Sequence, residues 1–234
     1  MPASAPSVGP QTAQAAPGPM DLVRLVMRFN LHPEIDLHPS WLPADWPARH
    51  RIPARLGEAG RTVLAGQLRR SQGPANGAAD YNFDARLKRV VLLDGAALRR
   101  LAAYLGFCVH LPLFRLRGGA GAQIRRQARR FDADAVEFLL ERVPQLTELR
   151  MDNAALQQWP LSAGRVAVDR GYRLLLAAAA AEGDAVRRRL GHKLPRRISA
   201  LGAPPLQRRQ ILQLNELMLS CIVPERLPQW DWLF

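Results

Sequence analysis

Histidine and cysteine are the side chains of this sequence best suited to catalysis or metal binding. The chain has five of the first and two of the second. His32 and His38 flank the segment HPEIDLHP. A zinc ion held by this pair would need two more ligands, and no cluster of cysteine or histidine supplies them. Because a proline follows each of these histidines, we predict that both are structural residues in turns.

A cysteine and a histidine also occur close together, as Cys108 and His110. A cysteine nucleophile needs a histidine within hydrogen-bond reach and a third group that orients it. Residues two apart on a helix point in different directions. We therefore predict that both side chains belong to the core. His192 lies near the end of a basic helical stretch, where it can interact favourably with the helix dipole.

The glycine-rich run RLRGGAGAQ, residues 115–123, is the candidate for phosphate binding. It lacks the lysine and hydroxyl residue of a P-loop, and no predicted strand precedes it. We interpret it as a turn between helices. Since no other cluster of catalytic groups is apparent, we predict a protein that is not an enzyme and that uses no cofactor or metal.

Arginine dominates the charge of the chain. The formal net charge is +13, and all but two of the 33 basic residues are arginine, the exceptions being Lys88 and Lys193. A nucleic-acid-binding protein would concentrate this charge on one face and often interleave aromatic residues, whereas here the clusters are spread and aromatics are only 6%. We interpret them as solvated faces or contacts to an acidic protein, with nucleic-acid binding as the alternative. The candidate interaction patches are Arg125, Arg126, Arg129, Arg130, Arg187, Arg188 and Arg189.

Large aromatic side chains gather towards the two ends of the chain. DLHPSWLPADWP, residues 36–47, is too rich in proline for a long helix. We predict that it wraps the helical body with at least one tryptophan buried as a plug, or otherwise that the pair contacts a partner. The candidate residues are Trp41, Leu42 and Trp46.

The second aromatic group ends the chain as PQWDWLF. Such side chains either fold back onto the core or anchor a partner, and the sequence leaves both interpretations open. The candidate C-terminal anchor is Trp230, Trp232 and Phe234.

The elements that must position these residues form one domain. Residues 1–19 are rich in alanine, proline and glycine and are predicted to be disordered. Residues 20–234 are predicted to be an α-helical domain, with 71–80 as a flexible loop. The fold class is therefore all-α: a single compact multi-helix domain with an irregular Pro/Trp-rich N-terminal segment.

Apolar stripes with start and stop signals predict the individual helices. Asp94, Asp132 or Asp134, and Ser162 mark helix starts, and the 162–181 helix is apolar nearly all round, so it should cross the middle of the domain. Residues 21–29 could be strand or helix, and we favour helix. The predicted helices cover residues 21–29, 53–70, 94–110, 132–143, 162–181, 185–194 and 204–225, with a further stripe at Ile124, Ala128 and Phe131.

The composition also predicts the cellular compartment. Two cysteines, Cys108 and Cys221, cannot build a disulfide framework and suit a reducing environment. No apolar run approaches the ~20 residues of a membrane helix, and no secretory signal is present at the N-terminus. We expect a cytoplasmic protein without an integral membrane segment.

Three segments resemble a known family. FNLHPEIDLHPSWLPADWP, residues 29–47, is similar to the opening of the K subunit of the type III secretion sorting platform, the SctK (YscK/PscK-like) proteins. VVLLDGAALRRLAAYLGFCVH, residues 90–110, resembles that family's leucine-rich helix. Trp159-Pro160, the helix GRVAVDRGYRLLLAAA and RRRLGHKLP form the third match. Order and spacing agree over roughly residues 20 to 225.

The resemblance implies a mostly helical adaptor with no enzymatic activity. It would act at the cytosolic face of the bacterial inner membrane, joining the cytosolic domain of an SctD-like ring protein to an SctQ-like pod protein. It would be peripheral to the membrane through these partners, within a protein-transport machine associated with virulence. The resemblance assigns no contact residue.

Overall fold

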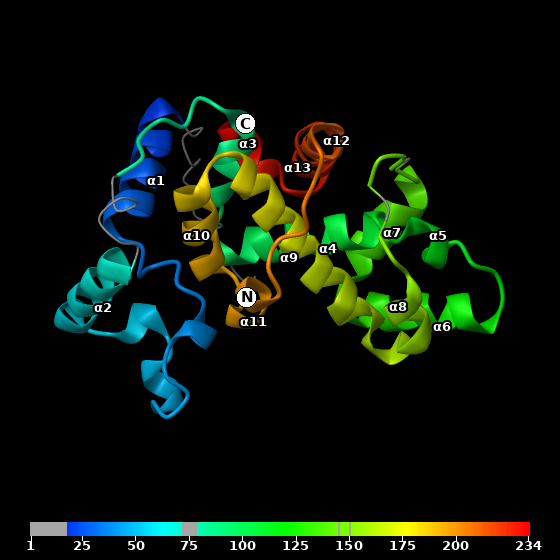
Figure 1. The fold of residues 1–234 in the computed structure, drawn as a ribbon, viewed down its shortest axis with the longest axis horizontal. Helices are drawn as coiled ribbons and strands as arrows, with labels where there is room; N and C mark the ends of the chain where they lie inside the picture. Colours follow the sequence, from blue (N-terminus) through cyan, green and yellow to red (C-terminus); the bar gives the residue numbers. More distant parts are fainter. Residues whose placement is uncertain (1–17, 72–78, 145, 150) are drawn as a thin grey trace, which may run out of the picture.

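The computed structural model describes residues 18–71, 79–144, 146–149 and 151–234, and every regular element in these ranges is a helix (Figure 1). The predicted all-α class is confirmed. The α-helices are α1 (Pro19–Leu31), α2 (Glu58–Ser71), α3 (Arg86–Arg89), α4 (Gly95–Cys108), α5 (Leu111–Phe114), α6 (Gly119–Phe131), α7 (Ala133–Arg142), α8 (Ala154–Gln158), α9 (Ala163–Ala181), α10 (Asp184–Lys193), α11 (Arg196–Leu201), α12 (Arg208–Glu216) and α13 (Val223–Arg226). The 3₁₀ helices are η1 (Pro39–Trp41), η2 (Ala48–His50), η3 (Pro53–Arg55), η4 (Val90–Leu92), η5 (Pro160–Ser162) and η7 (Pro228–Leu233), and a π-helix, η6 (Leu217–Ile222), joins α12 to α13.

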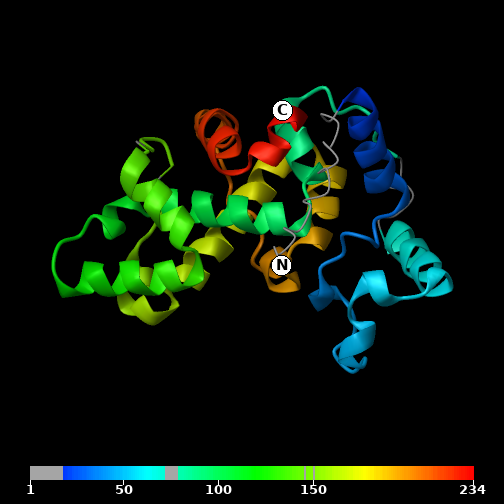
Figure 2. The ribbon, with the colours of Figure 1, turned by 180° about the vertical axis from the view of Figure 1, so that it is seen from behind.

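The molecule is elongated. α1 and α2 lie at one end and α5, α6 and α8 at the other, as the opposite views of Figures 1 and 2 both show. α4 and α9 pack against each other in the middle and connect the two ends. No helix of the described residues is both long and apolar enough to span a bilayer.

α4 and α9 approach each other closely through two glycines. A Cβ atom on Gly106 of α4 would lie 1.9 Å from the carbonyl oxygen of Ala167, and one on Gly171 of α9 would lie 1.8 Å from that of Ala102. The two contacts are reciprocal, since each helix presents a glycine to the backbone of the other. Only residues without a side chain fit at these positions, so the pair forms one rigid unit.

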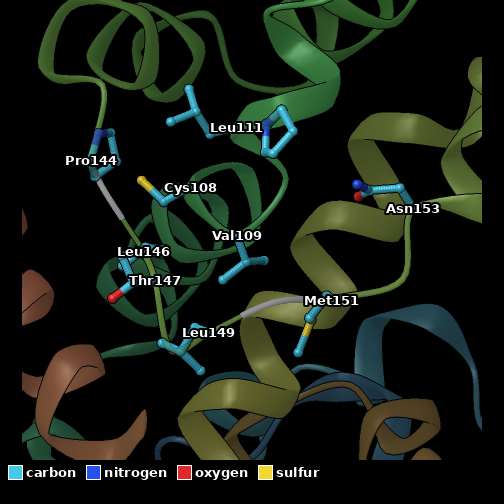
Figure 3. A pocket seen from close by; sticks show the side chains of 10 residues that line it. Cys108, Val109, Leu111, Pro144, Leu146, Thr147, Leu149, Met151 and Asn153 are labelled. Atoms are coloured by element: carbon cyan, nitrogen blue, oxygen red, sulfur yellow. The ribbon is translucent and has the colours of Figure 1, made fainter. Parts of the chain in front are cut away.

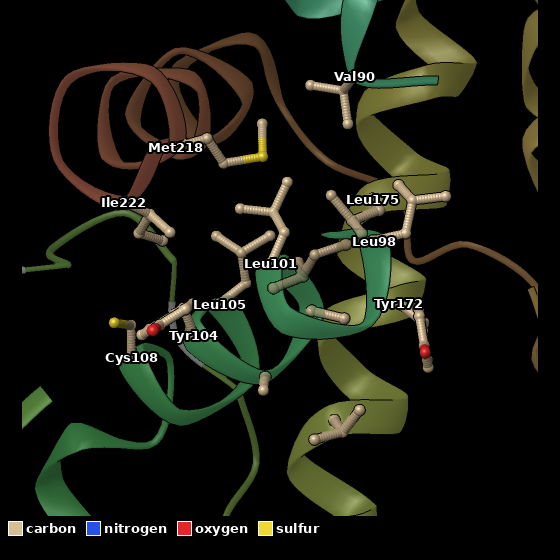
Figure 4. Close-up of a cluster of buried hydrophobic side chains, with 14 of the residues drawn as sticks. Val90, Leu98, Leu101, Tyr104, Leu105, Cys108, Tyr172, Leu175, Met218 and Ile222 are labelled. Atoms are coloured by element: carbon tan, nitrogen blue, oxygen red, sulfur yellow. The ribbon is translucent and has the colours of Figure 1, made fainter. Parts of the chain in front are cut away.

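The core surrounds this helix pair. Leu98, Leu101 and Leu105 of α4 are fully buried and lie with Leu175 of α9 and Met218 of η6 in one apolar cluster (Figure 4). The prediction that the 162–181 helix crosses the middle is confirmed, because its residues 174 to 179 are buried all round. The predicted caps are confirmed for Asp94, whose carboxylate accepts from the Ala97 N–H at 2.7 Å, and for Asp132, which accepts from that of Ala135.

Two predicted helix starts, one predicted turn and one predicted buried position are wrong. The last predicted helix begins at Arg208 rather than at 204. α2 begins at Glu58 rather than 53, because η3 ends in an extended Leu56 before Gly57. The glycine-rich run 115–123 is a turn only as far as Gly118; from Gly119 it is helix α6. Phe131 does not continue the buried stripe of Ile124 and Ala128 but is exposed.

Two predicted irregular segments fall largely outside the described residues. Residues 1–17 of the predicted tail and 72–78 of the predicted loop are not described. Within the predicted tail, α1 already begins at Pro19. At the far side of the loop, the Asp80 N–H donates to Asn30 Oδ1 at 2.9 Å, which joins the returning chain to α1.

Candidate functional site

The Pro/Trp-rich segment docks on the end of α10. The Trp41 ring lies edge-to-face with the His192 ring, and its indole N–H donates to the Leu194 carbonyl at 2.9 Å. Trp41 is half-buried and Leu42 is buried, whereas Trp46 is 36% exposed. Neither tryptophan is fully buried as predicted. Leu42 is the buried residue of the three candidates, Trp41 is half-buried against α10, and Trp46 is exposed.

Charged side chains are buried where this segment meets α10. Lys193 Nζ lies 3.1 Å from Asp36 Oδ2 and donates to the Leu93 carbonyl at 3.1 Å. Burial lowers the pKa of Lys193, and the Asp36 carboxylate opposes this shift. An unpaired ammonium here would be costly, so Asp36 and Lys193 hold the segment in a single position.

The second lysine is buried in the same manner. Lys88 Nζ lies 2.7 Å from Asp80 Oδ2 and over the Phe83 ring, 4.9 Å from its centroid. Both lysines of this chain are thus internal and paired with an aspartate.

The run Arg187 to Arg189 is not an exposed interaction patch. Arg189 is buried, donates to the Phe29 carbonyl and lies over the Phe29 ring, 5.0 Å from its centroid. Arg187 and Arg188 are half-buried, and Arg187 pairs with Asp184 at 3.2 Å. Arg189 therefore helps to attach α1 to α10, which corrects the assignment of the whole run as a candidate patch.

The arginines of α6 divide into two groups. Arg125 is half-buried and donates to the Phe114 and Leu116 carbonyls at 2.7 and 2.8 Å, so it caps the end of α5. Arg126, Arg129 and Arg130 are exposed and have no ion pair among the described residues. Only these three remain candidate contacts.

The C-terminal aromatics fold back onto the core. Trp230, Trp232 and Phe234 are half-buried against it, and Leu233 between them is buried. Arg89 donates to the Leu233 carbonyl at 3.0 Å. Of the two interpretations left open by the sequence, the structure shows the fold-back.

His110 forms a buried polar centre. Its Nδ1–H donates to Asn153 Oδ1 at 2.6 Å, because that oxygen can only accept, and its Nε2 accepts from Arg170 at 2.8 Å. Burial lowers the pKa of His110 to about 4, and Arg170 acts in the same direction. The imidazole is therefore neutral near pH 7, with both nitrogens used. The predicted core location of His110 is confirmed.

A cavity of about 390 Å³ lies beside this centre (Figure 3). The Cys108 sulfur and the Asn153 amide lie at its walls, which are otherwise mainly apolar side chains. Burial raises the pKa of Cys108, so its sulfur stays a neutral thiol and a weak nucleophile. Among the described residues that line the cavity, no two side chains form an acid–base pair.

Metal binding finds no support in the part of the chain that is described. No group of three or more histidine, cysteine, aspartate or glutamate side chains there could hold an ion. His38 instead hydrogen-bonds Ser40, and His32 lies 3.3 Å from Glu34. Cys108 and Cys221 are free thiols, as expected.

Two exposed apolar surfaces lie at opposite ends of the molecule. The α1 surface is a stripe along the outer side of α1, and the η5 surface lies where η5 packs on α6. Trp159 and Leu161 are 62% and 71% exposed, and Met20 is 66% exposed. The α1 surface consists of Met20, Val23, Met27 and Leu31; the η5 surface consists of Phe131, Trp159 and Leu161.

The sequence carried a signal for only one of these surfaces. Met20, Val23, Met27 and Leu31 recur every three or four residues, opposite the half-buried Leu22 and the buried Val26 and Phe29, so α1 has two apolar sides. Trp159 and Leu161 stand in a short proline-containing segment without periodicity. Their exposure follows from the packing of α6, α8 and α9.

Comparison with known proteins identifies no relative. No family model matches the chain, and no curated protein and no solved structure matches it.

Proposed function

We propose that this chain is a non-enzymatic, cytosolic adaptor of the type III secretion sorting platform, similar to the SctK proteins. It would link the cytosolic domain of an SctD-like inner-membrane ring protein to an SctQ-like pod protein. The observation that carries the proposal is the presence of two exposed apolar surfaces at opposite ends of one helical body. Exposed apolar clusters of this kind mark sites of protein association.

The body between the two surfaces suits a linker that holds its partners at a fixed distance. α4 and α9 meet backbone to backbone at Gly106 and Gly171, and the flanking side chains are buried. Such a close-packed pair resists bending. Binding at either end would therefore fix the position of the other end in space.

The three segments that resemble the SctK family also meet in this structure. Lys193, in RRRLGHKLP, pairs with Asp36 of the first segment and donates to the carbonyl of Leu93 in the second. The first segment contacts the third again, because the His38 N–H donates to the His192 carbonyl at 2.9 Å. Residues that match a family in sequence and pack together in space support a shared fold, and through it the proposed role.

Co-purification tests the proposal. The full chain, carrying an affinity tag, is co-expressed with the SctD-like cytosolic domain and the SctQ-like pod protein, and the complexes are separated by size-exclusion chromatography. We expect a complex that contains all three proteins. If the chain is recovered with neither of the two partners, the adaptor role is contradicted.

Nucleic-acid binding is the second candidate function. It is favoured by exposed arginines without ion pairs among the described residues, five of which gather around α6: Arg115, Arg117, Arg126, Arg129 and Arg130. Tight binding of an oligonucleotide at physiological salt, with a steep dependence on salt concentration, would support it. If binding of the oligonucleotide vanishes at modest salt, it is a non-specific attraction between charges and not a function of the chain.

A further inference from the structure

The η5 surface combines apolar exposure with unpaired positive charge. Arg126 and Arg130 lie one turn apart on α6, the helix on which η5 packs. Both are exposed, and neither has an ion pair among the described residues. Arg99 lies over the Phe131 ring, 5.4 Å from its centroid, and adds a third cation.

The α1 surface has a different electrostatic character. Its neighbour Arg24 pairs with Asp21 at 3.2 Å, and Arg28 pairs with Asp36. These charges are compensated within the chain, so they present little net field to a partner. Apart from Arg69, which donates to the Leu31 carbonyl at 3.4 Å, the cations described beside the α1 surface are thus paired, and more of the unpaired positive charge lies at the η5 end.

We propose that the η5 surface binds an acidic protein segment that carries large apolar side chains. Trp159 and Leu161 would contact the apolar side chains, while Arg126 and Arg130 would pair with carboxylates. Tryptophan and arginine are the residue types most enriched in interface hot spots, and arginine binds carboxylates in a bidentate manner. This inference deepens the proposed function by giving the chemistry of one partner.

The same surface suits single-stranded nucleic acid less well. Binding of nucleotides requires open aromatic faces on which bases can stack. The Phe131 ring is covered by Arg99 and packs against Gly164, where an added Cβ would lie 2.7 Å from Phe131 Cβ. Leu161, the most exposed member of the surface, has no ring. Only Trp159 remains as a stacking face.

Binding of synthetic probes tests the inference on the full chain. Two fluorescent peptides carry leucine at i, i+3, i+4 and i+7, and one has glutamate and the other lysine at the remaining positions. The third probe is a single-stranded oligouridylate. We expect the glutamate peptide to bind at physiological salt and the lysine peptide and oligouridylate not to bind.

Two double variants locate the binding site. Trp159→Ala with Leu161→Ala, and Arg126→Glu with Arg130→Glu, should each weaken binding of the glutamate peptide by about tenfold or more. All four side chains are exposed, so the fold should persist, which circular dichroism checks. The matched controls are Leu201→Ala, at a residue 58% exposed on α11, and Arg208→Glu with Arg209→Glu on α12; both should bind as the unchanged chain does.

The outcomes separate this inference from the adaptor role. Equal affinity for the glutamate and lysine peptides, unchanged affinity in both double variants, or oligouridylate binding at this surface would each overturn it. If the glutamate peptide fails to bind but both partner proteins co-purify, the inference is lost and the adaptor role is kept. If the peptide binds as expected and neither partner co-purifies, the proposed binding at the η5 surface is retained and the adaptor role is contradicted.

Discussion

At the scale of single residues, His110 shows how a reactive side chain becomes structural. Its two ring nitrogens are both occupied, by Asn153 and by Arg170. An imidazole with no free nitrogen and no exposure cannot accept a proton from a substrate without first losing a hydrogen bond. The consequence is a pH dependence of stability rather than of catalysis.

We predict that His110 destabilises the folded chain at acid pH. Its pKa is about 4 when folded, against 6.5 ordinarily, so as the pH falls below 6.5 the unfolded chain takes up the proton first. The stability contributed by neutral His110 is complete above pH 6.5 and is lost between there and pH 4. His110→Gln carries an amide oxygen that can still accept from Arg170, and its side chain does not titrate.

Urea unfolding of both chains at about pH 7 and pH 5 measures this difference. The free energy of unfolding should fall by about 2 kcal/mol more in the unchanged chain than in His110→Gln. Other groups cancel, because the two chains share them. Equal losses would mean that the pKa of His110 is the same in the folded and the unfolded chain.

We also predict that the two N-terminal tryptophans differ in their effect on stability. Trp41→Ala removes a hydrogen bond and a half-buried ring, which should cost about 2–3 kcal/mol, less than for full burial. Trp46→Ala should change stability by less than about 0.5 kcal/mol. Guanidinium unfolding of both variants makes the comparison, and similar losses in the two would contradict the docking of Trp41 described above.

From the sequence, the burial of such residues could be predicted better than the residues that they contact. The spacing of Cys108 and His110, two residues apart on a helix, was enough to predict that His110 belongs to the core. Asn153 and Arg170, which satisfy it, lie 43 and 60 residues further along the chain, and no local rule links such distant positions. Similarly, Arg187 to Arg189 look like a solvated cluster until the ring of Phe29 is placed against Arg189.

At the scale of elements, the α4–α9 contact depends on two residues without side chains. We predict that Gly106→Ala and Gly171→Ala each lower the free energy of unfolding by about 3 kcal/mol or more, because the new methyl group meets backbone that cannot move alone. The matched control is Gly95→Ala in the same helix α4, where nothing lies within 4 Å.

Gly95→Ala should be neutral or should stabilise by up to about 1 kcal/mol, because alanine favours the helix more than glycine does. Thermal unfolding followed by circular dichroism compares the three variants. A small loss at Gly106 and Gly171, similar to that at Gly95, would show that the helices can separate at little cost.

The helices themselves could largely be predicted, whereas their contacts could not. Apolar periodicity and the caps Asp94 and Asp132 fixed the type and order of the elements. Starts without a cap were misplaced, as at α2, where proline at position 53 was read as a first turn. The glycines of the helix crossing gave no signal, because a glycine inside an apolar helix can mark a close approach or nothing at all.

At the scale of the whole molecule, the α1 and η5 surfaces should act independently. We predict that Val23→Ser with Met27→Ser removes one of the two proposed partners, and that Trp159→Ala with Leu161→Ala removes the other. Changes at sites far apart and without shared contacts are additive. Pull-down of each partner with each variant checks this, and loss of both partners from a single change would argue against separate sites.

The burial of both lysines has a practical consequence. Lys88 and Lys193 hold their ε-amino groups inside the fold against Asp80 and Asp36. Reagents that acylate amines, including the succinimidyl esters common in cross-linking mass spectrometry, should leave both side chains unmodified while the chain stays folded. Neighbours in an assembly would be mapped better through carboxylates, and delayed acylation of Lys193 would report on detachment of the Trp41 segment from α10.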